Sequence, residues 1–205
     1  MRCRIKICGL TRPEDVETCV EAGADAIGFV FYSESPRAVT PQNMQALLAN
    51  IPAFVQTVGL FVNPDRRWVE EVCQAVPLDL LQFHGEESRA FCESFGKPYI
   101  KAIRVRPELD LLQYCFTYAS ARGVLLDAYH PNLWGGSGQS FDWSLIPKNC
   151  SLPVILSGGL NESNVGEAIR AVHPFAVDVS SGVEISKGIK DASRIQAFIS
   201  GVLKA

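Results

Sequence analysis

The sequence predicts a single-domain α/β protein, residues 1–205, in which eight parallel strands close into a barrel surrounded by helices. Its 205 residues suit one domain with one core, and no Gly-, Ser- or Pro-rich linker divides them. Eight short runs with strand-like composition begin 20 to 31 residues apart, which leaves room for a helix and two loops in each interval. Intervals of about 8–12 residues would have indicated a β-sandwich. The pattern favours a (β/α)8 barrel, also called a TIM barrel.

The strands expected from these runs cover residues 4–8, 26–31, 57–62, 79–83, 99–105, 123–127, 153–157 and 175–180. Helix-start signals follow several of them. Thr11 and Glu14 have the spacing of a capping box, and Thr40-Pro41 and Asn63-Pro64 each place a cap residue before a proline. A doubly wound open sheet is the alternative fold. Neither a G-x-G-x-x-G turn after the first strand nor a GxxxxGK[ST] loop occurs in the sequence, so the barrel is preferred.

Composition excludes several classes of partner. The 19 Lys and Arg residues are fewer than the 22 Asp and Glu residues, and the net charge of −3 argues against nucleic-acid binding and against anionic membranes. No apolar run reaches the roughly 18 residues of a membrane span, and the first residues lack the apolar segment of a signal peptide. The seven cysteines are odd in number and lack C-x-x-C spacing. We therefore expect a soluble, cytoplasmic protein with reduced cysteines and no zinc site.

Strand alternation predicts where the functional groups lie. In the first, fourth, sixth and eighth strands one parity is apolar and suits the helix layer, while the other parity carries the polar side chains. The last polar residues of these strands are Cys8, His84, Asp127 and Ser180. Because barrel enzymes place their chemistry at the carboxyl ends of the strands, we expect these four side chains around one mouth.

Two glycine loops follow the last two strands. They contain Gly158 and Gly159 in the first loop and Ser181 and Gly182 in the second. Barrels commonly bind phosphate with backbone N–H groups at these two loops. The alternative is that both are tight turns, but their occurrence together at the expected strands favours a phosphate site.

Cys8 and Asp127 are the candidate acid–base pair. A neighbouring cation such as Lys6 can lower the pKa of a thiol, and a thiolate can abstract a proton. Cys8 could instead be a small buried apolar residue, and Asp127 could cap a turn. The residues alone leave these readings open.

Four further features have two readings each. Arg37 could hold a substrate carboxylate or lie solvated in its loop, and His84 could donate to a substrate or satisfy interior neighbours. Asp178 is expected to pair with Lys6 or Lys101 inside the barrel. Residues 133–138, rich in glycine, form either a lid over the mouth or an ordinary loop.

An ordered set of motifs carries a family resemblance. The motifs are Lys6-Ile-Cys-Gly-Leu-Thr11, Gly28-Phe-Val-Phe-Tyr32, Gln82-Phe-His-Gly85, Gly135-Gly-Ser-Gly138, Phe141-Asp-Trp143, Ser157-Gly-Gly-Leu160 and Asp178-Val-Ser-Ser-Gly-Val-Glu184. Together they resemble the phosphoribosylanthranilate isomerases of tryptophan biosynthesis, from the first strand to the last.

The resemblance implies an Amadori rearrangement of N-(5-phosphoribosyl)anthranilate without metal or cofactor. It assigns Asp127 as general acid, Cys8 as general base, Arg37 as the partner of the anthranilate carboxylate, and the loops at Gly158–Gly159 and Ser181–Gly182 as the phosphate site. A histidine-pathway isomerase of this type uses two aspartates, so Cys8 argues against it. A barrel that only binds a phosphorylated ligand is the other alternative, and the oligomeric state stays open between monomer and homodimer.

Overall fold

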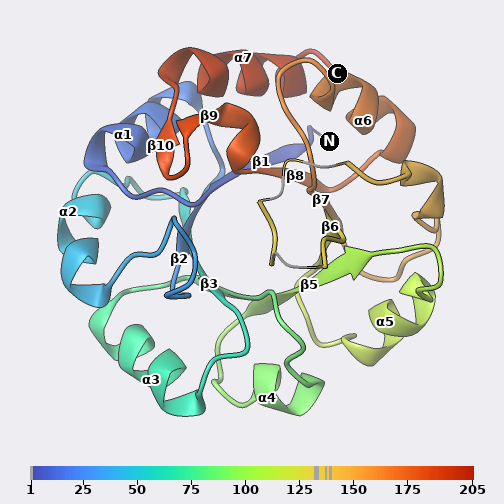
Figure 1. Ribbon diagram of the computed structural model, residues 1–205, viewed down its shortest axis with the longest axis horizontal. Helices are drawn as coiled ribbons and strands as arrows, with labels where there is room; N and C mark the ends of the chain where they lie inside the picture. Colours follow the sequence, from blue (N-terminus) through green and yellow to red (C-terminus); the bar gives the residue numbers. More distant parts are fainter. Residues whose placement is uncertain (1, 132–133, 137, 139) are drawn as a thin grey trace.

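The computed structural model describes residues 2–131, 134–136, 138 and 140–205. Its eight parallel strands form a closed barrel in sequence order, as Figure 1 shows. They are β1 (Arg4–Cys8), β2 (Ala26–Val30), β3 (Gln56–Phe61), β4 (Leu80–Phe83), β5 (Tyr99–Val105), β6 (Val124–Ala128), β7 (Val154–Leu156) and β8 (Ala176–Val179). The strand β1 pairs with both β2 and β8, which closes the sheet. The predicted fold class is thereby confirmed, and no strand end differs from its predicted position by more than one residue.

Seven α-helices of the described residues surround the barrel (Figure 1). They are α1 (Pro13–Ala22), α2 (Met44–Leu48), α3 (Arg66–Ala75), α4 (Arg89–Glu93), α5 (Leu111–Thr117), α6 (Val165–Val172) and α7 (Ala192–Leu203). Short 3-10 turns form η1 (Pro41–Asn43), η2 (Trp143–Leu145) and η3 (Ser181–Val183), and β9 (Glu184–Ser186) and β10 (Ile189–Lys190) form a small antiparallel hairpin. A helix after every strand was expected, but the described residues between β6 and β7 form only η2. This segment is rich in glycine and proline, which disfavour a helix interior.

Two helix-start predictions were wrong. The residue before α1 is Arg12, and Thr11 instead donates its hydroxyl to the carbonyl oxygen of Gly188 at 2.5 Å. The residue before α3 is Asp65, whereas the side-chain oxygen of Asn63 accepts from the Glu86 amide at 2.7 Å. In both cases a neighbouring loop uses the side chain that the sequence pattern assigned to a cap. Thr40 does precede η1, but without a side-chain cap bond.

The predicted alternation of side chains is confirmed. Apolar residues of one parity, such as Ile7, Leu81 and Val177, are fully buried with the helices in the main core. Inside the barrel, an apolar layer closes the region near the amino ends of the strands, formed by Ile100, Ala102, Leu125, Ile155 and Ala176. Polar side chains occupy the interior beyond that layer. The barrel interior is thus filled by apolar side chains near the amino ends of the strands and lined by polar side chains near their carboxyl ends.

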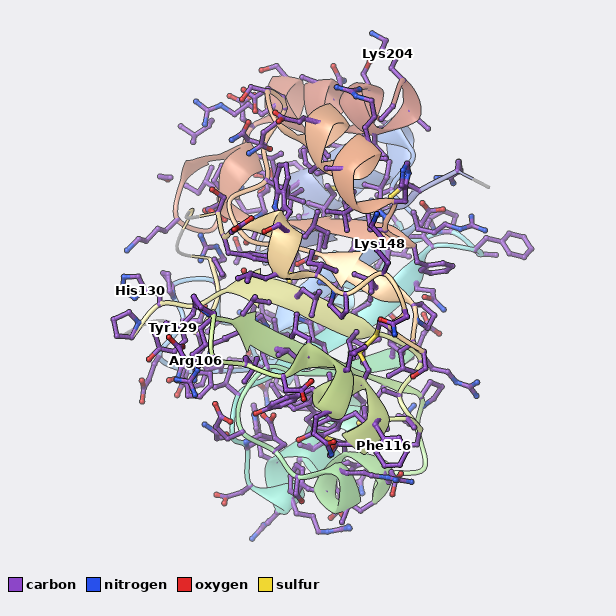
Figure 2. All side chains as sticks on the ribbon, turned by 90° about the vertical axis from the view of Figure 1, so that its right-hand side faces the viewer. Arg106, Phe116, Tyr129, His130, Lys148 and Lys204 are labelled. Atoms are coloured by element: carbon purple, nitrogen blue, oxygen red, sulfur yellow. A yellow bond between two sulfur atoms is a disulfide. The ribbon has the colours of Figure 1, made fainter. Side chains whose placement is uncertain are left out.

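One disulfide contradicts the expectation of fully reduced cysteines. Cys115 of α5 is bonded to Cys150 in the segment before β7, and the yellow bond is visible in Figure 2. Both residues belong to the same apolar cluster, so folding brings them together although 35 residues separate them in the sequence. Neither the odd count nor the missing C-x-x-C spacing could reveal such a long-range pair. The other five cysteines are free.

Within the described part of the chain, no helix is long and apolar enough to cross a membrane.

Candidate active site

A cavity of about 180 Å³ opens at the carboxyl ends of the strands. The predicted residues that line it are Cys8, Arg37, His84, Asp127, Gly158, Gly159, Ser180 and Ser181. Gly182 is not part of this lining, because its Cα packs against the carbonyl of Leu160. In Figure 2, Arg106 and Tyr129, which follow β5 and β6, lie on the side of the molecule where the strands end. The structure therefore gathers residues from both ends of the chain at one mouth.

Cys8 ends β1 and is only 4% exposed. Its sulfur lies so close to β2 that a Cβ on Gly28 would be 2.7 Å from it, so only glycine fits there. Burial raises the pKa of the Cys8 thiol, and the charge of Asp178 adds to this rise, while Lys6 and Lys190 oppose it. The expectation that Lys6 lowers the pKa of this thiol below its ordinary value was wrong, because desolvation outweighs the attraction of the cations.

The cation beside Cys8 belongs to a buried ion pair. Lys6 Nζ lies 2.6 Å from Asp178 Oδ1, with both side chains 6% exposed, and Ser157 donates its hydroxyl to Asp178 Oδ2 at 3.1 Å. Burial alone would disfavour the charged ammonium. The attraction of Asp178 and Cys8 outweighs it and raises the pKa of Lys6 to about 12. Of the two partners expected for Asp178, the structure selects Lys6, since Lys101 pairs with Glu87.

Asp127 lies at the carboxyl end of β6, and both Asp127 and His84 line the cavity. Its Oδ1 accepts from the Ala128 amide at 2.8 Å, and its Oδ2 lies 3.2 Å from His84 Nε2. Gln82 Nε2 lies 3.0 Å from His84 Nδ1, so the amide group is placed to donate to Nδ1 and to leave the ring proton on Nε2. His84 Nε2 lies 3.2 Å from Asp127 Oδ2 but makes no hydrogen bond to it, so among the described residues this buried ring nitrogen has no hydrogen-bond partner.

The glycine-rich loop after β6 covers this carboxyl group. A Cβ on Gly135 would lie 3.0 Å from Asp127 Oδ2, and Trp134, Gly135, Gly136 and Gly138 all line the cavity. The Trp134 ring also carries the guanidinium of Arg104, 3.6 Å from its centroid. Leu133 and Ser137, which belong to the expected lid, lie outside the described residues. The described part of the loop thus lies over the mouth.

Arg37 is not a solvated loop arginine. It is 8% exposed, and its Nε and one terminal nitrogen donate to the two carboxylate oxygens of Glu184, each at 2.7 Å. Glu184 Oε1 also accepts from Lys190 Nζ at 2.9 Å. Sequence reasoning found Arg37 but missed Glu184 and Lys190 as parts of the site. Their only signal was that Glu184 closes a motif in the loop after β8.

The two glycine loops are shaped by close backbone contacts. Gly158 has φ +81°, and a Cβ there would lie 2.7 Å from the Ala128 nitrogen, so a side chain is excluded. Asn164, the residue before α6, donates its side-chain amide to the Gly159 carbonyl at 2.9 Å and so ties the loop to the start of that helix. The second loop begins η3 at Ser181. Both loops present backbone rather than charged side chains to the cavity.

No group of three or more His, Cys, Asp or Glu side chains in the described ranges has the geometry to hold a metal ion.

A closed barrel with a polar cavity at the carboxyl ends of its strands is the architecture of the (β/α)8-barrel enzymes. The family model for N-(5'-phosphoribosyl)anthranilate (PRA) isomerase matches residues 5–201. The chain belongs to this family.

Individual relatives agree with this assignment. An N-(5'-phosphoribosyl)anthranilate isomerase of Pseudomonas putida is 58% identical over 202 residues, which cover 98% of each chain. The phosphoribosyl anthranilate isomerase of Thermotoga maritima has 41% identity and a TM-score of 0.91, covering 99% of this chain and all of that one. A further structure of such an isomerase, with 40% identity and a TM-score of 0.87 over the same shares of both chains, is a complex with reduced 1-(o-carboxyphenylamino)-1-deoxyribulose 5-phosphate. The protein is accordingly an enzyme of tryptophan biosynthesis, an intramolecular oxidoreductase of the aldose–ketose isomerase class.

Proposed function

We propose that this cavity converts N-(5'-phosphoribosyl)anthranilate to 1-(2-carboxyphenylamino)-1-deoxyribulose 5-phosphate by general acid–base catalysis, with Asp127 as acid and Cys8 as base. The observation that carries the proposal is that a carboxyl group and a thiol from two distant strands line one cavity. The complex of a relative with a reduced form of this product supports the choice of ligand. The reaction needs no metal or cofactor, and we place it in the cytoplasm.

The first step opens the sugar ring. Asp127 transfers a proton to the furanose oxygen, the bond between that oxygen and C1 breaks, and the nitrogen lone pair forms the C1=N bond of a protonated Schiff base. His84 Nε2 lies 3.2 Å from Asp127 Oδ2, where an N–H group stabilises the carboxylate left behind. We assign His84 to substrate binding at this end of the cavity.

The second step moves a proton from C2. The Cys8 thiolate removes it, the electron pair forms the C1=C2 bond, and the C1=N electrons return to nitrogen to give an enolamine. The enolamine then tautomerises, with its hydroxyl proton lost and C1 protonated, to the ketone. Since burial raises the pKa of the Cys8 thiol, the ammonium groups of Lys6 and Lys190 are the local features that favour the thiolate this step requires.

Anchoring both anionic ends of the substrate aligns its sugar between acid and base. We assign the phosphate to the backbone of Gly158, Gly159, Ser181 and Gly182 and the anthranilate carboxylate to Arg37. The Cα of Gly182 packs against the Leu160 carbonyl and does not face the cavity. Gly182 therefore contributes to phosphate binding only through its backbone, within η3.

Turnover of purified variants tests the assignment. The substrate is generated in situ, and loss of its anthranilate fluorescence is followed for wild type, Cys8→Ala and Asp127→Asn. Each variant should lose about 10²- to 10⁴-fold in kcat while product affinity stays near wild type, because each lacks a proton-transfer group and little binding surface.

A matched control is Cys73→Ala, which removes a half-buried thiol of α3 far from the mouth. It should leave kcat unchanged. Near wild-type kcat for Cys8→Ala would remove Cys8 from the mechanism, and no turnover by wild type would reduce the site to a binding function.

A further inference from the structure

Arg37 is held by a residue from the opposite end of the chain. The loop after β2 carries Arg37, and Glu184 begins the β9–β10 hairpin, 147 positions later. The two side chains are 9% and 5% exposed and make two parallel hydrogen bonds of 2.7 Å. This bidentate arrangement fixes the plane as well as the position of the guanidinium.

The pairing uses only one edge of that guanidinium. Glu184 occupies the edge formed by Nε and Nη2. The other terminal nitrogen, Nη1, lies against the loop after β6, where a Cβ on Gly136 would be 2.7 Å away, and both Arg37 and Gly136 line the cavity. Because Glu184 pairs with Nε and Nη2, the edge formed by Nη1 and Nη2 is the one that remains for a second carboxylate where Arg37 lines the cavity.

A carboxylate next to an anion site would by itself repel the ligand. Lys190 balances it, since its side chain is fully buried and its Nζ lies 2.9 Å from Glu184 Oε1. Although burial disfavours the charged form, Arg37 and Lys190 hold the pKa of Glu184 below its ordinary value. Two cations and one anion leave a net charge of +1, which matches one substrate carboxylate.

Lys190 also connects this unit to the strand that carries Cys8. Its Nζ donates to the Cys8 carbonyl at 2.6 Å and to the Ser180 carbonyl at 3.1 Å. The Gly188 backbone N–H donates to Glu184 Oε1 at 3.3 Å, and Arg194 donates to the Glu184 carbonyl at 2.6 Å. The hairpin thus sets the position of Arg37 relative to the exit of β1.

We propose that Glu184 and Lys190 are positioning residues that orient Arg37 and set the net charge of this group of three residues. We propose that the group thereby selects substrates with a carboxylate on the aromatic ring. The inference rests on the proposed function, in which Arg37 binds that carboxylate. Glu184 acts through Arg37, whereas Lys190 acts through Glu184 and also favours the Cys8 thiolate; neither side chain touches a reacting atom.

The substitution Glu184→Gln separates positioning from simple charge effects. Removing a negative charge near an anionic substrate lowers KM on electrostatic grounds alone. Loss of the bidentate pairing instead frees the guanidinium, so we expect KM to rise roughly tenfold or more with a smaller change in kcat. Inhibition by inorganic phosphate, which reports the other end of the site, should stay within about twofold and also shows that the variant is folded.

Three further variants complete the test. Glu184→Asp keeps the charge but shortens the side chain, and it should raise KM as well. Lys190→Met removes the balancing cation and should also raise KM, and kcat should fall as well because Lys190 favours the Cys8 thiolate. Glu70→Gln breaks the exposed ion pair with Arg66 on α3 and should leave KM unchanged.

A double-mutant cycle decides between positioning and general damage. In the Arg37→Ala background, Glu184→Gln should add little to KM, because the group it positions is absent. A KM for Glu184→Gln at or below wild type, or an equal effect in the Arg37→Ala background, overturns the inference. If Arg37→Ala itself leaves KM unchanged, the carboxylate assignment of the proposed function fails instead.

Discussion

Replacing Asp178 by Asn should destabilise the protein and at the same time make Cys8 more acidic. The substitution keeps the size of the side chain but removes the anion 2.6 Å from Lys6 Nζ. Lys6 then remains as a buried cation, since the pair is 6% exposed on each side. Two measurable consequences follow from this one change.

The first consequence is a loss of stability. Breaking a buried ion pair by removing one partner costs about 3–5 kcal/mol, because the remaining charge stays desolvated. For a chain of 205 residues this corresponds to a fall in Tm of roughly 6–20 °C. Replacing both partners by apolar residues, as in Lys6→Met with Asp178→Leu, should recover most of the loss.

The second consequence concerns the thiol. Burial raises the pKa of Cys8 first of all, Asp178 raises it further and Lys6 lowers it. Without Asp178 the ammonium acts on the thiol alone, so the pKa of Cys8 should fall and the thiolate should form at lower pH.

Urea unfolding and thiol alkylation measure the two effects separately. Unfolding curves compare wild type, Asp178→Asn and the double variant. The rate of iodoacetamide alkylation against pH reports the thiol, with Cys8→Ala as the blank for the other free cysteines. A stability within about 0.5 kcal/mol of wild type, or an alkylation profile that does not move to lower pH, refutes the reasoning.

Three other predictions concern the scaffold. Reduction of the Cys115–Cys150 disulfide should lower the free energy of unfolding by about 3–4.7 kcal/mol, since it frees a loop of 35 residues; equal urea midpoints with and without reductant would contradict this. Gly158→Ala should weaken inhibition by phosphate and lower Tm more than Gly96→Ala. Both glycines have positive φ, but only a Cβ at position 158 would meet backbone atoms. Equal losses of Tm would exclude this backbone contact as the cause. Asp25→Asn should cost stability at neutral pH but not in acid. Although burial opposes ionisation, Arg2, the Ile5 amide and Arg4 hold the pKa of Asp25 below 3.8. The contribution of Asp25 to the free energy of unfolding is therefore present above that pH and is lost as the pH falls through the native pKa. A stability difference from wild type that persists in acid would count against this.

Periodicity explains what the sequence could predict. Alternation in β1, β4, β6 and β8 placed Cys8, His84, Asp127 and Ser180 at one mouth, because side-chain direction in a strand depends only on position. The same rule put Lys6 and Asp178 in the barrel interior, where a buried charge needs a partner.

Contacts between loops could not be predicted in this way. Glu184 reaches Arg37 only because the β9–β10 hairpin folds against the loop after β2, and no repeating pattern records that meeting. The disulfide is of the same kind. The direction of the Cys8 pKa failed for another reason: a sequence shows that a cation is near, but not how much water the fold removes from the sulfur.

Closure of the barrel by β1 and β8 has a consequence for synthesis of the chain. Lys6 and Asp178 are 172 residues apart, so at about 5–20 residues per second the ribosome makes the partner of Lys6 roughly 9–34 s later. Throughout this interval one edge of β1 has no neighbouring strand. A charged lysine on an open edge opposes association with the edges of other nascent chains. The Lys6 ammonium, which lies beside the Cys8 thiol in the folded protein, therefore also protects β1 from association while β8 is still being translated.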